Sequence, residues 1–213
     1  YIHFVFLFVI RKFYQIYLLF RPMHIEKNVS LKPYNTFGVE ATASFFTQIK
    51  NLNQLQEALD FASENKLPLL LMGGGSNVLF TKNFPGLVIR LQMKGISETR
   101  QDDNHVLVTA AAGENWHEFV TYCVAKNYGG IENLSLIPGN AGTSPMQNIG
   151  AYGTEIKNTF DHCTVMNTET RSLETFRLED SALLPIPIIL LRNMERSVPN
   201  CKKKISHNLR FRM

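Results

Sequence analysis

The segment Gly129–Gly153, GGIENLSLIPGNAGTSPMQNIGAYG, constrains the fold more strongly than any other part of this chain. It contains six glycines and two prolines, and its single charged residue is Glu132. Because glycine and proline both interrupt regular structure, this composition predicts a long irregular segment rather than a helix or a strand. Loops of this length are uncommon in compact domains and are usually functional or disordered. The apolar residues Leu134, Leu136 and Ile149 argue against disorder.

The backbone N–H groups of this segment must still find hydrogen-bond acceptors when the chain folds. A bound planar cofactor can supply such acceptors, which makes the segment a candidate cofactor site. The alternative is a long surface loop whose N–H groups are hydrated.

A second glycine cluster lies between the apolar runs 67–72 and 78–80, and it consists of Gly73, Gly74, Gly75, Ser76 and Asn77. Consecutive glycines permit positive φ and the close approach of another group to the backbone. Their N–H groups can converge on one anion, so the turn suits a pyrophosphate. The cluster is neither a P-loop, because no Gly-Lys-Ser/Thr follows, nor a GxGxxG motif. A tight strand–strand turn is the alternative, although one or two glycines would suffice for it.

The region between Met23 and Asp180 carries the signals of an α+β domain. Apolar residues at helical spacing predict helices over 53–66 and 113–127. Short apolar runs predict strands over 69–72, 78–80, 86–91, 105–111, 160–167 and 175–178.

The apolar face of the second predicted helix consists of Trp116, Phe119, Val120, Cys123 and Val124. This placement makes Cys123 a core residue rather than a nucleophile. His117 lies off that face, so we expect its side chain to be solvated.

Composition excludes several functional classes. The chain has 213 residues and is 45% hydrophobic, which suits one large or two small domains with a sizeable core. The net charge of +4 comes from its two ends, and residues 23–185 alone carry −5. A nucleic-acid site needs a basic face on the folded domain, so we expect none. The cysteines, Cys123, Cys163 and Cys201, predict a reducing cytoplasm, no disulfide framework and no metal site.

The two ends differ from the middle. Residues 1–22 are apolar and aromatic, but Arg11 and Lys12 split them into runs too short to span a membrane. We expect translation to begin at Met23 and residues 1–22 to be a non-native upstream extension, with a membrane anchor as the alternative. After Asp180, two prolines interrupt an apolar run and no helical or strand periodicity follows.

Four motifs carry a family resemblance: LKPYNTFG, GGGSNVLF, AGENWHEFV and LSLIPGNAGTSPMQNIGAYG. In this order, between Met23 and about Asp180, they resemble the UDP-N-acetylenolpyruvoylglucosamine reductases, also called UDP-N-acetylmuramate dehydrogenases. The resemblance implies an α+β FAD-binding domain of the vanillyl-alcohol-oxidase (PCMH) type, over residues 23–180, with two subdomains and FAD between them.

The resemblance also implies which residues bind FAD. The turn of Gly73, Gly74, Gly75, Ser76 and Asn77 would hold the pyrophosphate. The flavin and its ribityl chain would be lined by Gly142, Thr143, Ser144, Gln147, Ile149, Gly150 and Gly153. No metal is implied.

The family's reaction belongs to peptidoglycan synthesis. NADPH reduces the flavin, the flavin passes hydride to UDP-N-acetylglucosamine enolpyruvate, and a serine protonates the resulting enolate, which an arginine and a glutamate stabilise. The resemblance implies a cytoplasmic, monomeric enzyme with no membrane partner.

The resemblance stops near residue 181. The family's Phe-Gly-Tyr-Arg segment, with its catalytic arginine, should fall near residues 183–186, where this chain has LLPI. The serine and glutamate belong to a C-terminal substrate domain that the sequence lacks, so no catalytic residue is assigned. A one-base shift can convert codons for residues 183–190 into a Tyr-Arg segment, so we expect residues 181–213 to be an out-of-frame tail. The alternative functions are an inactive FAD-binding fragment and another flavin oxidoreductase of this fold.

Overall fold

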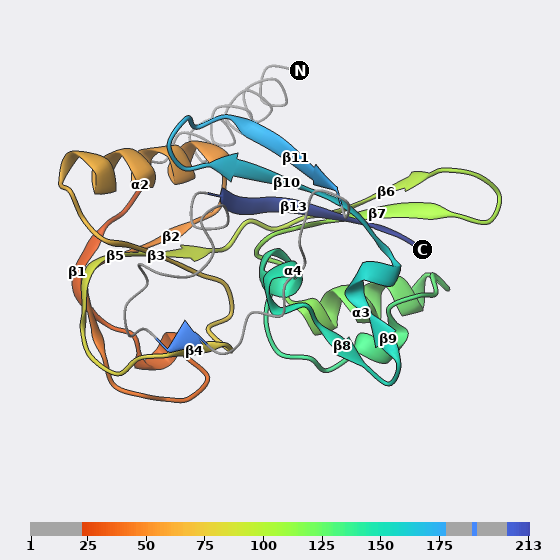
Figure 1. The fold of residues 1–213 in the computed structure, drawn as a ribbon, viewed down its shortest axis with the longest axis horizontal. Coiled ribbons are helices and arrows are strands. Elements are labelled where there is room, and N and C mark those ends of the chain that lie inside the picture. The colour runs from red at the N-terminus through yellow and green to blue at the C-terminus, as the bar shows by residue number, and fades with distance from the viewer. Residues whose placement is uncertain (1–22, 178–188, 191–203) are drawn as a thin grey trace, which may run out of the picture.

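The computed structural model describes residues 23–177, 189–190 and 204–213. Two β-sheets lie side by side, one of four strands and one of five (Figure 1). This arrangement of helices and sheets in two parts agrees with the predicted α+β fold. Within the described residues, no helix is both long enough and apolar enough to cross a lipid bilayer. The expectations for residues 1–22, 178–188 and 191–203 lie outside the described residues.

The four-stranded sheet is built by the first half of the described chain. In spatial order its strands are β1 (Glu26–Ser30), β2 (Thr42–Ile49), β5 (Phe84–Leu91) and β3 (Leu69–Met72). β1 is antiparallel to β2, whereas β2, β5 and β3 run parallel. Helix α2 (Leu52–Glu64) forms the crossover that parallel strands require. Its buried Leu55 and Leu59 share a core with Leu87 and Ile89. The predicted helix over 53–66 and the strands over 69–72 and 86–91 are therefore confirmed.

The five-stranded sheet is antiparallel throughout. In spatial order its strands are β11 (Leu173–Arg177), β10 (Phe160–Asn167), β13 (Lys204–Arg212), β7 (Val106–Ala111) and β6 (Ile96–Arg100). Helix α3 (Trp116–Ala125) packs against this sheet and is shorter than predicted, because Asn115 caps its start by accepting from the Glu118 N–H at 3.1 Å. Val124 was predicted on the apolar face, but it is 49% exposed.

The glycine-rich segment 129–153 contains no long helix or strand, as its composition predicts, and its elements are all short. They are η2 (Glu132–Leu134), η3 (Ala141–Thr143), α4 (Ser144–Gln147) and the first strand of the hairpin formed by β8 (Gly150–Ala151) and β9 (Thr154–Glu155). The remaining short elements are η1 (Lys32–Tyr34), η4 (Ile156–Asn158) and the parallel pair of β4 (Val78–Leu79) and β12 (Ile189–Leu190).

The end of the chain forms a central strand. β13 lies between β10 and β7, and its residues Leu209 and Phe211 are fully buried. The ring of Phe211 contacts those of Trp116, Phe119 and Phe160, with centroid distances of 5.7, 5.2 and 6.1 Å. The expectation of no periodic element after Asp180 is therefore wrong for residues 204–212, which form β13 and place Leu209 and Phe211 in the core. Whether residues 181–213 are read in their native frame stays a prediction.

Two buried cysteines give the first testable prediction. Burial raises the pKa of the Cys123 thiol to about 12 and that of Cys163 to about 11. At about pH 8, where an ordinary thiol is partly ionised, both should remain neutral in the folded protein and should not react with a disulfide reagent. As pH rises above the ordinary thiol range, the unfolded thiols ionise first, so stability should fall.

The reaction is best measured in a Cys201→Ser variant, because Cys201 lies outside the described residues. We expect no colour release by the native variant at about pH 8, and release from both thiols after denaturant is added. Rapid reaction of the native variant would contradict the buried positions of Cys123 and Cys163.

Candidate functional site

The two glycine-rich segments predicted to bind a cofactor pack against each other. A Cβ atom added to Gly73 would lie 2.9 Å from Cγ2 of Thr143, and one added to Gly74 would lie 2.8 Å from Oδ1 of Asn140. The hydroxyl of Ser76 donates to the carbonyl of Pro138 at 3.2 Å. We call residues 73–77 and 138–147 together the glycine cradle.

Gly75 has a separate reason to be glycine. Its φ is +72°, in the left-handed region, and an added Cβ would lie 1.9 Å from the carbonyl oxygen of Tyr34. The carbonyl of Gly75 in turn accepts from the Thr36 N–H at 3.1 Å. Each of the three glycines therefore permits a different close contact, which a simple strand–strand turn would not require.

The turn presents backbone donors. Among the hydrogen bonds of the described residues, none uses the N–H group of Gly74, Gly75 or Ser76 as donor. Gly74 is exposed, Ser76 is half-buried and Gly75 is buried. Backbone N–H groups that have no acceptor among the described residues can form an anion-binding concavity in a turn of this kind, so the turn has the donor chemistry that a pyrophosphate needs.

The second half of the cradle is fixed by the segment before α3. The N–H groups of Ala141 and Gly142 donate to the carbonyls of Glu114 and Ala112, at 2.8 and 3.0 Å. A Cβ on Gly142 would lie 2.5 Å from the Cβ of Ala112, so the two backbones approach as closely as glycine allows.

The remaining residues predicted from the resemblance have different surroundings. Thr143 Oγ1 accepts from Gln147 Nε2 at 3.3 Å, inside the cradle. Ser144 is buried, and its hydroxyl donates to the Ala141 carbonyl at 2.7 Å, which is a structural contact. Ile149 belongs to the hydrophobic core beside the five-stranded sheet. The other predicted residues are Asn77, Gly150 at the start of β8 and Gly153, which has φ +78° in the hairpin turn.

Some residues of the site were not predicted. Asn140 is buried, and its Nδ2 donates to the Gly113 carbonyl at 3.0 Å. Tyr34 supplies the carbonyl that Gly75 faces, and its LKPYNTFG motif was the available signal. Asn148, directly after α4, has φ +43°, and its buried Oδ1 has no partner among the described residues. A buried unpaired acceptor beside the cradle suits a site that gains a partner on ligand binding.

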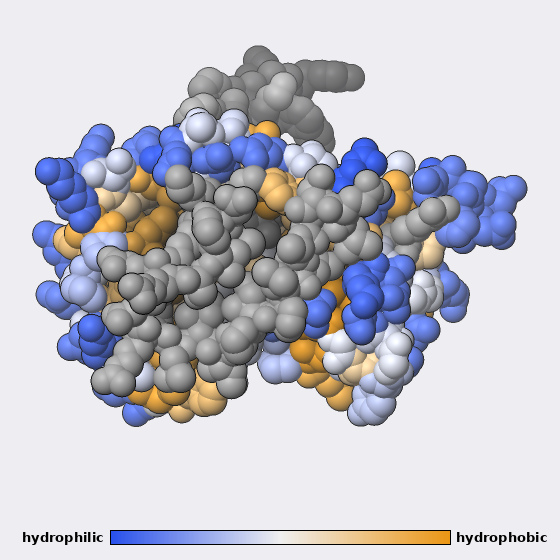
Figure 2. Space-filling view, viewed as in Figure 1, coloured by the Kyte–Doolittle hydropathy of each residue, from blue (hydrophilic) through white to orange (hydrophobic). Residues whose placement is uncertain are grey.

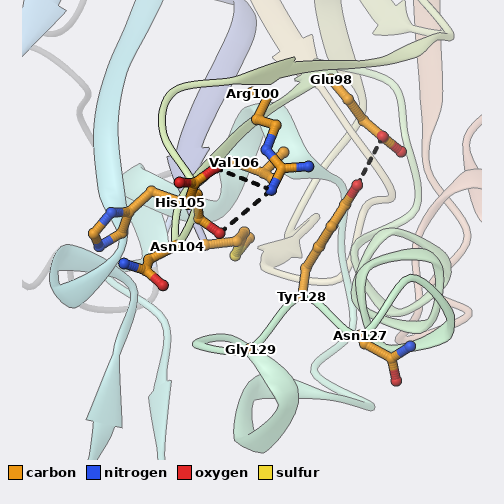
Figure 3. Close-up of a pocket in the computed structure, with 10 residues that line it drawn as sticks. Glu98, Arg100, Asn104, His105, Val106, Asn127, Tyr128 and Gly129 are labelled. Atoms are coloured by element: carbon orange, nitrogen blue, oxygen red, sulfur yellow. Dashed lines mark hydrogen bonds and ion pairs between the residues drawn. The ribbon is translucent and has the colours of Figure 1, made fainter.

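A separate cavity of about 520 Å³ lies near the β6–β7 hairpin (Figure 3). Arg100 donates there to the carbonyls of Asp102 and Asp103, at 3.2 and 3.4 Å. Glu98 accepts from the hydroxyls of Tyr122 and Tyr128, and these bonds hold the pKa of Glu98 below its usual range. The hairpin tip is hydrophilic (Figure 2). Since these polar groups already pair with one another, the cavity has no evident chemistry.

The described residues also contain no group of three or more histidine, cysteine or acidic side chains placed to hold a metal ion.

Comparison with known proteins gives a family match and a fold match. The family described as FAD binding domain matches residues 43–172. The UDP-N-acetylenolpyruvoylglucosamine reductase of Pseudomonas syringae pv. tomato is 47% identical over 160 residues, which are 75% of this chain and 47% of that protein. The enzyme of that name from Flavobacterium johnsoniae is 49% identical over 154 residues, covering 72% and 45%. The chain spans about half the length of the curated relatives it matches.

Solved structures share the fold. The crystal structure of UDP-N-acetylenolpyruvylglucosamine reductase from Thermus caldophilus aligns with a TM-score of 0.65 at 21% identity, covering 89% of this chain and 62% of that one. The structure of p-cresol methylhydroxylase with substrate bound aligns with a TM-score of 0.56 at 14% identity, covering 85% and 38%. The fold is therefore that of a PCMH-type FAD-binding domain, as predicted.

Proposed function

The chain belongs to the FAD binding domain family, and within it to the UDP-N-acetylenolpyruvoylglucosamine reductases, and from this premise we propose that it is the FAD-binding part of such a reductase. The proposed enzyme uses NADPH to reduce UDP-N-acetylglucosamine enolpyruvate to UDP-N-acetylmuramate in peptidoglycan synthesis. The observation that carries the proposal is the glycine cradle, which joins two sequence segments at a turn whose N–H groups have no acceptor among the described residues.

The residues of the cradle suit FAD. The N–H groups of Gly74, Gly75 and Ser76, which have no described acceptor, would donate to the pyrophosphate, whose negative charge such a turn stabilises. Thr143 and Gln147 would offer polar groups beside the flavin and its ribityl chain. Ser144 and Ile149 are buried, so they would support the cradle from the core side and would not offer exposed polar groups to FAD. Bound FAD would supply the hydride transfer between NADPH and the enolpyruvyl double bond.

A second candidate function is FAD binding without turnover. The chain spans about half the length of its relatives, and no residue in it is assigned as the enolate-stabilising arginine, the proton-donating serine or the glutamate. Hydride transfer to the enolpyruvyl group needs those groups to stabilise the enolate. The chain would then bind FAD and fail to reduce the substrate.

One experiment separates the two candidates. The chain is loaded with FAD, freed of unbound FAD by gel filtration, reduced by NADPH without oxygen, and then given UDP-N-acetylglucosamine enolpyruvate. Return of the visible flavin absorption with this substrate, but not with UDP-N-acetylglucosamine as the control, supports the reductase. Retained FAD without return of the absorption supports the binding fragment. A folded chain that retains no FAD contradicts both candidates.

A further inference from the structure

The start of α3 holds the loop that leads into the glycine cradle. Trp116 donates from its indole Nε1 to the Leu134 carbonyl at 2.8 Å and from its backbone N–H to the Gly139 carbonyl at 3.0 Å. Between these two anchors, Nδ1 of His117 lies 3.1 Å from the hydroxyl of Ser135 and 3.3 Å from the N–H of Leu136. Residues 134–139 are thus tied to one helical turn.

The bond from Leu136 defines the role of His117. A backbone N–H can donate and cannot accept, so Nδ1 of His117 is the acceptor of this bond. The expectation that this side chain is solvated is therefore wrong, because the ring is half-buried and its Nδ1 faces the loop.

Leu136 needs such a restraint. Its φ is +61°, a left-handed conformation that is strained for a large side chain, and the side chain is 78% exposed, so core packing does not hold it there. The Leu136 N–H donates to Nδ1 of His117, and this hydrogen bond restrains the residue. Two residues later, Pro138 supplies the carbonyl that accepts from Ser76 across the cradle.

We propose that His117 is a positioning residue for FAD, which sets the conformation of residues 135–137 and thereby the fit between the two halves of the glycine cradle. This inference rests on the proposed function, since FAD is the ligand whose binding it affects. Removing the Nδ1 acceptor leaves the Leu136 N–H without this hydrogen bond, so FAD affinity should fall.

The charged groups nearby do not take over this role. Glu118 on α3 and Glu132 on η2 are the carboxylates of the adjoining elements, and neither forms a described ion pair with His117. The carboxylate of Glu132 instead accepts from the Gly130 N–H at 2.5 Å. Nδ1 of His117 therefore remains the acceptor for the Leu136 N–H.

The test compares FAD dissociation constants, measured by flavin fluorescence titration at one pH, in wild type, His117→Ala and His117→Asn. His117→Ala removes the acceptor and should bind FAD about fivefold more weakly than wild type, the loss expected for about one net hydrogen bond. His117→Asn should bind about as well as wild type, because an amide oxygen can accept in place of Nδ1.

His105→Asn serves as the matched control. His105 lies at the hairpin tip beside Asp102, 2.9 Å from its carboxylate, and its replacement should leave the FAD affinity unchanged. A His117→Ala variant that melts earlier but binds FAD as wild type does, or a folded His117→Asn variant that binds as weakly as His117→Ala, would overturn the positioning role. If His117→Ala does not fold, His117→Asn still decides, because weak FAD binding by this folded variant would overturn the role and near-normal binding would support it. Failure of wild type to bind FAD would instead overturn the proposed function.

Discussion

Replacing Gly75 by alanine is expected to destabilise the fold strongly and to abolish FAD binding. Alanine at φ +72° costs about 1–2 kcal/mol in a left-handed conformation. The added Cβ would also lie 1.9 Å from the Tyr34 carbonyl oxygen, and forcing backbone apart in a packed site typically costs about 1–3 kcal/mol more. The turn would then move, together with the N–H groups of Gly74, Gly75 and Ser76 that we propose hold the pyrophosphate.

Gly38→Ala provides the matched control for this change. Gly38 has φ +63°, and an added Cβ would meet no atom within 4 Å. Urea denaturation should show a loss of about 1–2 kcal/mol for this variant, from the backbone conformation alone. Gly75→Ala should lose clearly more and should fail to bind FAD in a titration. Equal stability losses and normal FAD binding in both variants would show that the close approach to Tyr34 is not required.

The second large effect is expected at the end of the chain. Phe211→Ala removes a fully buried ring that contacts Trp116, Phe119 and Phe160, and such changes cost about 3–5 kcal/mol. Because small domains are stable by about 5–15 kcal/mol, the variant should be partly unfolded or melt at a much lower temperature. Equilibrium denaturation followed by circular dichroism measures the difference.

Phe37→Ala is the corresponding control, because the phenylalanine at position 37 is 56% exposed. Its removal should change the free energy of unfolding by less than about 1 kcal/mol. The comparison also tests the out-of-frame hypothesis. If residues 204–212 are a non-native tail that does not pair with β7 and β10, then Phe211→Ala will change the free energy of unfolding as little as Phe37→Ala does. A large difference between the two variants would show that this strand is part of the folded core.

The features that sequence predicted well are those set by local patterns. Leu55, Ala58, Leu59 and Ala62 recur at helical spacing, and they form the buried face of α2. The run Leu69–Met72 is both short and apolar, and it is strand β3 with the same limits. The two glycine clusters lie together because Gly73 and Gly74 have no Cβ that would collide with Thr143 and Asn140, whereas their role as a cofactor site stays a prediction.

The features that were missed depend on residues distant in the sequence. β13 was missed because a basic segment next to a proline-interrupted run has little strand signal, whereas its partners β7 and β10 supply the hydrogen bonds and the core for Leu209 and Phe211. His117 was predicted to be solvated from its position on the helix alone. The loop that it contacts begins 18 residues later, and helical periodicity gives no information about it.

The most direct test of the account is an FAD titration of the purified wild-type chain, with Gly75→Ala and Gly38→Ala measured beside it under the same conditions. The glycine cradle predicts saturable binding of one FAD per chain in wild type and Gly38→Ala, and none in Gly75→Ala. A wild-type chain with native circular dichroism and no bound FAD at saturation would contradict the central claim that the cradle is a cofactor site.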